Sequence, residues 1–243
     1  MSYLNKSRLE AAAIPVVAHA KAGASAPYRR ARVTDISSAS AAGIYRSGLK
    51  RALDLSLIVL AAPIVVPVIG VLAGLVALGG GHPFYVQPRV GHGGRVFKMW
   101  KLRSMVMGAD ARLDAHLASD PAARQEWDID QKLKDDPRIT AMGRLLRKTS
   151  LDELPQLWNV FRGDMSLVGP RPMMPCQQDL YTGQAYYSLR PGITGPWQVS
   201  ARNDSSFADR AKYDREYDQT LCFAGDVGLL VRTVRVVVLA KGH

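Results

Sequence analysis

The chain has 243 residues, enough for one large domain or two small ones with a substantial hydrophobic core. Its two cysteines, Cys176 and Cys222, are too few for a disulfide framework and suit a reducing compartment. The net charge of +11 indicates an anionic partner, and 7% aromatic residues without a basic–aromatic pattern argue against nucleic acid.

Residues 1–45 are rich in Ala, Ser and Arg and show no sustained hydrophobic periodicity. We interpret them as a flexible N-terminal tail whose basic residues Arg29, Arg30 and Arg32 are available to a membrane surface. The apolar patch at Ala11–Ala18 lacks the length and the flanks of a signal peptide.

An uncharged apolar segment from Leu55 to Leu78 is long enough to cross a hydrocarbon core about 30 Å thick. A single transmembrane helix is the default interpretation, and the buried helix of a water-soluble protein is the alternative. Pro63 and Pro67 lie in its middle, where each removes a backbone hydrogen bond and clashes with the preceding turn.

Basic residues flank this segment on both sides. Lys50 and Arg51 precede it, and five Lys or Arg residues follow between Arg89 and Arg103. Short flanks rich in Lys and Arg stay in the cytoplasm. We therefore favour a re-entrant membrane helix over residues 46–81 that breaks at the two prolines, with Lys50 and Arg51 at the membrane. A kinked full span stays open, because true spans tolerate proline kinks.

We assign residues 82–243 to one cytoplasmic domain. It begins with a short β-hairpin or extended pair at Pro83–Met99, where apolar and basic positions alternate around glycines. Leu102–Leu133 is typical of a helix with a break at Asp120-Pro121, and its acidic residues indicate a solvated face.

A new helix is expected to start at Asp136-Pro137. One stripe of this helix is apolar and the opposite side carries arginines. Such a cationic amphipathic helix lies in the lipid interface or packs on a core with its arginines in water. The neighbouring apolar segment favours the interface. The stripe consists of Ile139, Met142, Leu145 and Leu146.

Leu154–Phe161 predicts a short apolar helix, and turn-rich stretches at 168–172 and 190–196 predict loops. A polar helix is expected over Ser205–Tyr217 and an apolar C-terminal helix over Val227–Leu239. The predicted fold class is α+β: a mainly helical, membrane-associated domain with interfacial helices and one small β-hairpin.

Two adjacent carboxylates, Asp152 and Glu153, follow a cationic pair in the run Arg147–Gln156. Nearby cations and helix N-terminal N–H groups favour the charged form of a carboxylate. An ionised carboxylate can attack phosphorus or bind a hard cation. Ser150-x-x-Glu153 ahead of an apolar run is also a capping box, which only starts a helix. The run alone leaves both interpretations open.

Short sequence blocks follow one another from Lys50 to the C-terminus. They are Lys50-Arg51-x-x-Asp54, Phe84-Tyr-x-Gln-x-Arg-x-Gly91, Phe97-Lys-x-x-Lys-x-Arg-Ser-Met105, Asp136-Pro-Arg-Ile-Thr140, Arg147–Gln156, Asn159–Pro172, Arg190–Gln198 and Arg202-Asn203. In this order they resemble the bacterial monotopic phosphoglycosyl transferases, the polyprenyl-phosphate hexose-1-phosphate transferases. The ending and the length resemble most the subgroup that initiates succinoglycan-type exopolysaccharides, often with galactose.

The resemblance implies a re-entrant membrane helix and covalent catalysis. Asp152 matches the family's nucleophile and Glu153 a residue that helps to bind Mg²⁺, so both are candidate catalytic and metal-ligating residues. Taken alone, Arg171 between two prolines fits a rigid surface turn equally well, and Lys101 fits a solvated basic strand. The candidate substrate-binding residues are Arg147, Arg171, Arg202 and Lys101.

The resemblance further implies transfer of a sugar 1-phosphate from a UDP-sugar, of galactose or glucose type, to undecaprenyl phosphate. The expected partners are this donor, this acceptor and the lipid bilayer of the bacterial inner membrane, and a homodimer is left open. The rival hypotheses are a non-enzymatic basic membrane adaptor and an Mg²⁺-dependent phosphohydrolase. In two departures from the family pattern, Ala62 precedes Pro63 where many members have Ser, and Ala201 precedes Arg202 where Gly is common.

Overall fold

A computed structural model describes residues 43–130, 133–200 and 207–238. Ile36–His243 belong to one unit of the chain. The predicted tail lies outside the described residues except for residues 43–45, which are helical, and Tyr45 is buried. The helical chain therefore starts before the predicted end of the tail.

A long apolar helix opens the described chain. A π-helical turn, η2 (Tyr45–Leu49), runs into α2 (Lys50–Leu78). The 34 residues together are long and apolar enough to cross a membrane. Large apolar side chains on α2 are exposed, among them Leu60, Ile64 and Val71. Water-soluble proteins rarely expose so large an apolar surface, so α2 suits lipid surroundings.

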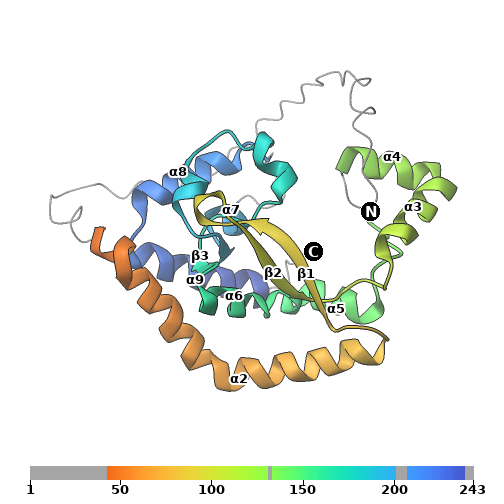
Figure 1. Ribbon diagram of the computed structural model, residues 1–243, viewed down its shortest axis with the longest axis horizontal. Coiled ribbons are helices and arrows are strands. Elements are labelled where there is room, and N and C mark those ends of the chain that lie inside the picture. The colour runs from red at the N-terminus through yellow and green to blue at the C-terminus, as the bar shows by residue number, and fades with distance from the viewer. Residues whose placement is uncertain (1–42, 131–132, 201–206, 239–243) are drawn as a thin grey trace. The chain divides into compact units, whose positions relative to one another are not determined.

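Pro63 and Pro67 lie within α2, and the helix continues through both. Figure 1 shows that α2, drawn in orange, bends near its middle, so that its two halves run in different directions. The predicted break is therefore a bend. Each proline lacks the N–H that would bond the carbonyl four residues earlier, which is an ordinary cause of a helix kink.

The predicted β-hairpin is confirmed. Strand β1 (Phe84–Val90) pairs antiparallel with β2 (Val96–Leu102), and the 3-10 turn η3 (His92–Gly94) joins them. Leu102 lies in a buried cluster with Val76 of α2. The hairpin is thus fixed against the second half of the long helix.

Two helices, α3 (Ala109–Ser119) and α4 (Pro121–Asp130), confirm the predicted break at Asp120-Pro121. The Oδ1 atom of Asp120 accepts hydrogen bonds from two backbone N–H groups in the first turn of α4 and so caps it. The first helix starts later than predicted, because Met105 still pairs with Ile139 in a β-bridge.

Helix α5 (Ala141–Thr149) begins after the predicted start at Asp136. Thr140 caps α5 by accepting a backbone hydrogen bond through Oγ1, whereas Asp136 forms an ion pair within the preceding turn. The predicted apolar stripe divides between two environments. Leu146 is fully buried in the cluster with α2 and β2, and Leu145 is exposed. The preference for the lipid interface is therefore wrong for Leu146, which packs on the protein core.

The loop predicted at 190–196 contains a short strand instead, and another short strand ends where the loop predicted at 168–172 begins. Strand β3 (Ser166–Val168) pairs in parallel with β4 (Gly192–Thr194). A Cβ atom at Gly192 would lie 2.1 Å from the backbone nitrogen of Gly169, so only glycine allows this approach. Strands of three residues carry too little periodicity to be predicted.

The predicted short apolar, polar and C-terminal helices are confirmed with shifted ends. The remaining elements are η4 (Leu151–Glu153), α6 (Gln156–Arg162), η5 (Pro175–Leu180), η6 (Ala185–Ser188), α7 (Pro196–Ser200), α8 (Arg210–Thr220) and α9 (Phe223–Val238).

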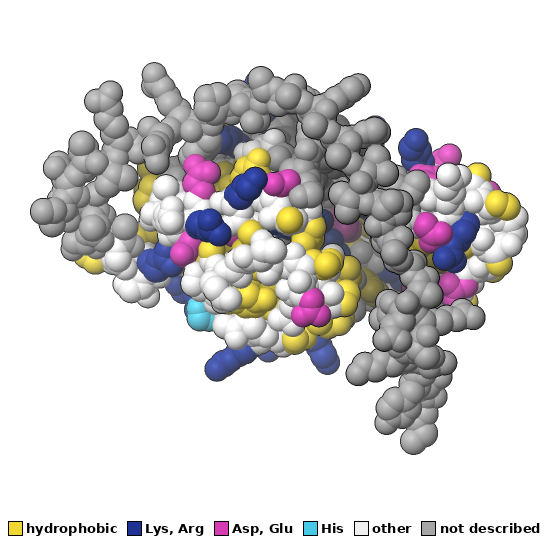
Figure 2. Space-filling view, turned by 90° about the horizontal axis from the view of Figure 1, so that it is seen from above, with side chains coloured by type: hydrophobic (Ala, Val, Ile, Leu, Met, Phe, Trp, Pro, Cys, Tyr) yellow, Lys and Arg dark blue, Asp and Glu magenta, His cyan; other side chains and the backbone are white. Residues whose placement is uncertain are grey.

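The surface of this unit on the side away from α2 differs in composition from the exposed apolar surface of α2. Helix α2 lies along the lower edge of Figure 1, and Figure 2 is seen from above. In Figure 2, acidic and basic side chains lie among apolar ones, a mixture typical of a water-exposed surface. The apolar exposure of α2 therefore marks the side on which we expect lipid.

Candidate active site

Asp152 and Glu153 lie in the short turn η4 between α5 and α6. Ser150 ends α5 in the left-handed conformation, with φ 56°, and its side chain makes no cap bond. The capping-box hypothesis is therefore wrong: Ser150 precedes η4 and its carbonyl accepts from the N–H of Glu153 at 3.2 Å, but its hydroxyl makes no cap bond. A left-handed non-glycine residue costs on the order of 1–2 kcal/mol, a strain that is most often found at functional sites.

Lys101 on β2 faces both carboxylates. Its Nζ atom lies 2.8 Å from Oε1 of Glu153 and 3.7 Å from Oδ2 of Asp152. Asn159 on α6 holds this part of β2 in place through two hydrogen bonds to the strand backbone. Its Nδ2 donates to the Lys98 carbonyl at 2.7 Å, and its Oδ1 accepts from the Trp100 N–H at 3.0 Å. Lys101 therefore belongs to the site and not to a solvated strand.

The ionisation of Asp152 is set mainly by its burial. Asp152 is 8% exposed, and desolvation raises the pKa of its carboxyl above the ordinary value. The charges of Lys101 and Arg147 oppose this rise, and that of Glu153 adds to it. The expected effect of nearby cations is thus outweighed by desolvation. A further cation beside the two carboxylates would favour the ionised form that attack on phosphorus requires.

Arg147, in the last turn of α5, reaches the same region. Its Nε atom donates to Oγ of Ser104 at 2.9 Å, which fixes the side chain. Burial lowers the pKa of Arg147, whereas the charges of Asp152 and Asp136 raise it. Arg147 and Asp152 therefore lie within electrostatic range of each other.

Arg171 follows β3 and lines a cavity of about 240 Å³ together with Glu153 and Gln198, which we call the Glu153 cavity. Its guanidinium carbon lies 5.7 Å from the centre of the Trp197 ring. The structure thus brings Arg171 and Glu153 to one cavity. The remaining predicted substrate contact, Arg202, lies outside the described residues.

Two adjacent carboxylates can serve as ligands of a cation here. In the part of the chain that the structure describes, no group of three or more His, Cys, Asp and Glu side chains could hold a metal ion. Mg²⁺ is usually bound through one or two carboxylates plus substrate phosphates, so Asp152 and Glu153 fit an ion whose coordination the substrate completes. Asp164, a weaker candidate ligand, instead contacts Asn159 and Arg162.

A second cavity of about 470 Å³ lies between α2, the hairpin and α6, and we call it the α2 cavity. Leu157 lines both cavities. The two cavities therefore adjoin at Leu157, and only the Glu153 cavity is lined by one of the two carboxylates. Only apolar side chains line the α2 cavity, and they include Ile58, Ala62, Val66, Phe84, Trp100, Trp158 and Phe161.

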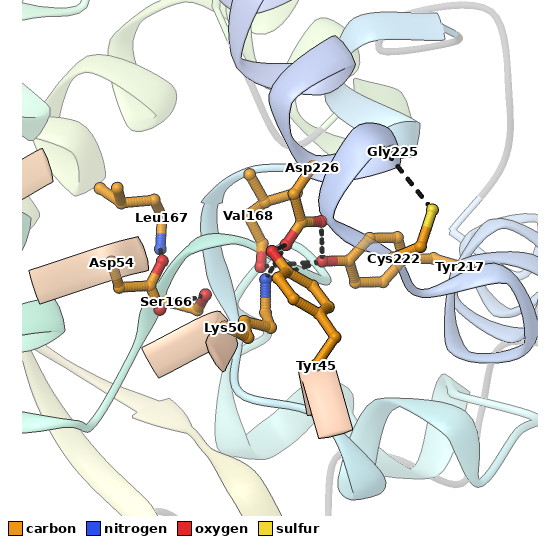
Figure 3. A network of polar contacts seen from close by, with 10 residues as sticks. All are labelled: Tyr45, Lys50, Asp54, Ser166, Leu167, Val168, Tyr217, Cys222, Gly225 and Asp226. Atoms are coloured by element: carbon orange, nitrogen blue, oxygen red, sulfur yellow. Dashed lines mark hydrogen bonds and ion pairs between the residues drawn. The ribbon is translucent and has the colours of Figure 1, made fainter. Parts of the chain in front are cut away.

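Figure 3 shows the polar contacts that fix the start of α2 against α8 and α9. Lys50 donates to Oδ2 of Asp226 at 2.5 Å and to the hydroxyl of Tyr217 at 2.9 Å. Tyr45 donates to the same carboxylate at 2.6 Å. Lys50 thus holds α2 to the domain, and its contact with lipid stays a prediction.

One turn further along α2, Asp54 accepts hydrogen bonds from the hydroxyl of Ser166 and the N–H of Leu167 at 2.8 and 3.1 Å (Figure 3). Both donors lie in β3, which leads to Arg171. Arg51 donates to two carbonyls at the end of α6. Helix α2 therefore positions the elements that carry the site, while the membrane contact of Arg51 is untested.

Comparison with known proteins adds the decisive observation, since the family model described as bacterial sugar transferase matches residues 45–240. The chain belongs to this family.

Curated relatives of this bacterial sugar transferase match over most of its length. It is 46% identical over 196 residues to the UDP-galactose-lipid carrier transferase of Erwinia amylovora, covering 80% of this chain and 41% of that protein. It is 43% identical to the exopolysaccharide production protein ExoY of Sinorhizobium fredii, covering 79% and 87%. It is 36% identical to the UDP-glucose:undecaprenyl-phosphate glucose-1-phosphate transferase of Caulobacter vibrioides, covering 76% and 68%. The chain thus spans less than half of the Erwinia protein.

Five predicted site residues of this bacterial sugar transferase lie in one region, namely Asp152, Glu153, Lys101, Arg147 and Arg171. Sequence reasoning missed Ser104 and Asn159, which position Arg147 and Lys101. Both belong to sequence blocks that carried the family resemblance, and this membership is the signal that could have identified them.

Proposed function

We propose that this protein transfers a sugar 1-phosphate from a UDP-sugar, of galactose or glucose type, to undecaprenyl phosphate and so initiates exopolysaccharide synthesis. Family membership and the names of the relatives support these classes of donor and acceptor. The observation that carries the proposal is the pairing of Asp152 and Glu153 with Lys101, together with the position of Glu153 in a cavity that adjoins the apolar α2 cavity at Leu157.

In the first step, an Oδ atom of ionised Asp152 attacks the phosphorus that bears the sugar. A P–O bond to Asp152 forms, the P–O bond to the nucleotide breaks, and UMP leaves with the electron pair. Lys101 and Arg147 offset the negative charge that the carboxylate and the diphosphate bring together. Arg171 binds phosphate oxygens through its forked N–H donors, a geometry that lysine does not provide.

In the second step, a phosphate oxygen of undecaprenyl phosphate attacks the same phosphorus. The bond to Asp152 breaks, which regenerates the carboxylate and yields the polyprenyl diphosphate sugar. A covalent intermediate divides one difficult transfer into two easier ones and lets a soluble donor and a lipid acceptor use the site in turn.

A bound Mg²⁺ would neutralise phosphate charge as a Lewis acid, and Asp152 and Glu153 would hold it together with substrate oxygens. Burial raises the pKa of Asp152 because it disfavours the charged form, and a bound cation would offset this effect.

The acceptor chain is accommodated on the side of α2. The α2 cavity is lined by apolar side chains, half of them from the long helix, and it meets the Glu153 cavity at Leu157. We therefore place the first isoprene units of the acceptor there. The bent α2 enters the inner membrane as a re-entrant helix, and both ends of the chain stay in the cytoplasm.

The test is a UMP-release screen of the purified protein with undecaprenyl phosphate and UDP-galactose, UDP-glucose or their N-acetyl derivatives. Release with one donor is expected, together with a phosphosugar trapped on the protein when the acceptor is omitted. Asp152→Asn should abolish trapping, whereas Asp179→Asn should preserve it, because Asp179 is exposed and lines neither cavity.

The same screen separates the rival functions. Absence of UMP release with every donor would favour a membrane adaptor. Formation of free sugar phosphate without the lipid acceptor would favour a phosphohydrolase. Undiminished trapping by Asp152→Asn would exclude Asp152 as the nucleophile.

A further inference from the structure

Three arginines from distant parts of the chain meet around Trp197. Arg171 and Arg210 lie over its ring, with guanidinium carbons 5.7 and 4.3 Å from the ring centre. Arg89 on β1 donates from Nη1 to the carbonyl of Pro172, the residue after Arg171, at 3.3 Å. The hairpin, the loop after β3 and α8 therefore place three guanidinium groups close together, and we call Arg89, Arg171 and Arg210 the arginine cluster.

Several polar atoms at this cluster are buried and lack a hydrogen-bond partner among the described residues. They are Nε of Arg89, Nε of Arg210 and both side-chain amide atoms of Gln198. A buried polar atom without a partner costs free energy, because folding has removed its water. Proteins retain such atoms mainly where a ligand, an ion or an ordered water satisfies them.

Burial and repulsion between neighbouring guanidinium groups also disfavour the positive charges of Arg89 and Arg210. Burial lowers the pKa of Arg210 to about 10, with the charges of Arg171 and Arg89 adding to this effect and Asp214 opposing it. Burial and the charge of Arg171 likewise lower the pKa of Arg89. Like charges held together in a partly desolvated place are stabilised when an anion binds between them.

The position of the arginine cluster indicates which anion binds there. Arg171 and Gln198 line the Glu153 cavity, which also carries hydroxyl groups. The α2 cavity, by contrast, is lined by α2, the hairpin and α6, without any member of the cluster. A lipid phosphate approaches along α2, whereas the phosphate of a water-soluble nucleotide reaches the cluster side.

We propose that Arg89, Arg210 and Gln198 form, together with Arg171, the binding site for the nucleoside 5′-phosphate of the donor, which leaves as UMP. This assignment rests on the proposed function. The leaving phosphate gains negative charge as its bond to the sugar-bearing phosphorus breaks, and forked guanidinium donors stabilise that charge most effectively in a partly desolvated site. The amide of Gln198 adds one donor and one acceptor for the nucleotide.

Equilibrium binding of UMP to the full-length protein in lipid nanodiscs tests the site without turnover. Arg89→Gln and Arg210→Gln should each weaken UMP binding in calorimetric titration on the order of 10–100-fold. Both should raise the KM for the UDP-sugar and leave the KM for undecaprenyl phosphate unchanged. Arg215→Gln removes an exposed cation from the same helix as Arg210 and should leave UMP binding unchanged.

Thermal unfolding separates binding from a structural role. Saturating UMP should raise the unfolding temperature of the wild type and not that of the variants. Unchanged UMP affinity with a lower unfolding temperature would overturn the proposal.

Two further outcomes separate the possible sources of the phosphate. Loss of affinity for undecaprenyl phosphate alone would assign the cluster to the acceptor and overturn the donor assignment. Absence of UMP release by the wild type with every donor would remove the proposed function. If UMP affinity still depended on Arg89 and Arg210 in that case, the nucleotide site itself would be supported.

Discussion

Lys50 and Asp226 lie 176 residues apart in the sequence and form a buried ion pair, with 2.5 Å between Nζ and Oδ2. Their side chains are 13% and 1% exposed. Tyr45 and Tyr217 donate to the same carboxylate, so the charge of Asp226 is satisfied by three donors. The pair joins the first turn of α2 to α9, and the long apolar helix is thereby held in a fixed register with the catalytic domain.

Lys50→Met should destabilise the protein by about 3–5 kcal/mol, because it leaves a buried carboxylate without its cation. Thermal unfolding in detergent measures this loss. Arg46→Gln is the matched control, since Arg46 pairs with Asp218 in a more exposed position and should contribute less than about 1 kcal/mol. Equal effects of the two substitutions would mean that the buried pair does not secure α2.

Lys101→Met should shift the acid limb of the pH profile of kcat/KM to higher pH. Lys101 opposes the rise in the pKa of Asp152 that burial causes, so its loss leaves less of the Asp152 carboxyl ionised at a given pH. At neutral pH we expect a decrease on the order of 10²-fold.

Lys98→Met, which changes an exposed cation on the same strand, provides the control and should leave the profile in place. A uniform decrease of kcat/KM by Lys101→Met at every pH would instead indicate that Lys101 acts only in binding the substrate.

Replacing both Pro63 and Pro67 by Ala should change how α2 sits in the membrane. The substitutions restore two backbone hydrogen bonds and remove the cause of the bend. A straight helix of 29 residues is about 44 Å long, enough to cross the bilayer. We expect an N-terminal reporter to move from the cytoplasm to the periplasm in part of the molecules.

Gly70→Ala, in the same helix and with open space around its Cβ, is the control and should keep the reporter in the cytoplasm. A cytoplasmic reporter in every molecule of the double variant would show that interactions such as the Lys50–Asp226 pair, and not the prolines, determine the topology.

Local sequence patterns were sufficient to predict those elements whose structure is determined by their own residues. The hairpin and the break at Asp120-Pro121 follow from alternation and capping, and both are confirmed. The pairing of β3 with β4 depends on backbone approach between distant glycines, which no local pattern reveals. The capping box failed because the Ser150 side chain makes no cap bond, although the sequence pattern is present.

The candidate site was predictable to the extent that it is contiguous in sequence. Asp152 and Glu153 are adjacent, so a joint role could be proposed from the sequence, and the family resemblance pointed to Arg147 and Arg171. The raised pKa of Asp152 was not predictable, because it arises from burial by elements far apart in the chain. The same reason hid the meeting of Arg89 with the loop of Arg171.

Ala62→Phe should fill part of the α2 cavity and raise the KM for undecaprenyl phosphate about tenfold, a loss that corresponds to about 1.4 kcal/mol of binding free energy. The KM for the UDP-sugar should stay unchanged, because Ala62 does not line the Glu153 cavity. Ala61→Phe places the same side chain one residue away, outside the lining of either cavity, and controls for altered membrane insertion. A parallel increase in both KM values would contradict placement of the acceptor in this cavity.

Asp214 should make the stability of the protein depend on pH. It is 3% exposed, and burial raises the pKa of its carboxyl from 3.8 to about 7, while the Tyr181 hydroxyl and Arg210 oppose this rise. Between these two values the folded state holds a proton that the unfolded state has released. The free energy of unfolding therefore falls as pH rises through this window, by at most about 4 kcal/mol, and then levels off.

Asp214→Asn removes this titration and keeps an oxygen that can accept the hydrogen bond from Tyr181. Relative to the wild type, the variant should therefore gain stability as the pH is raised from 5 to 8, which thermal unfolding across this range measures. Glu216→Gln, an exposed change on the same helix, should keep the wild-type dependence. If the wild type and Asp214→Asn had parallel stability profiles, Asp214 would be ionised in the folded state, with Arg210 compensating its charge fully.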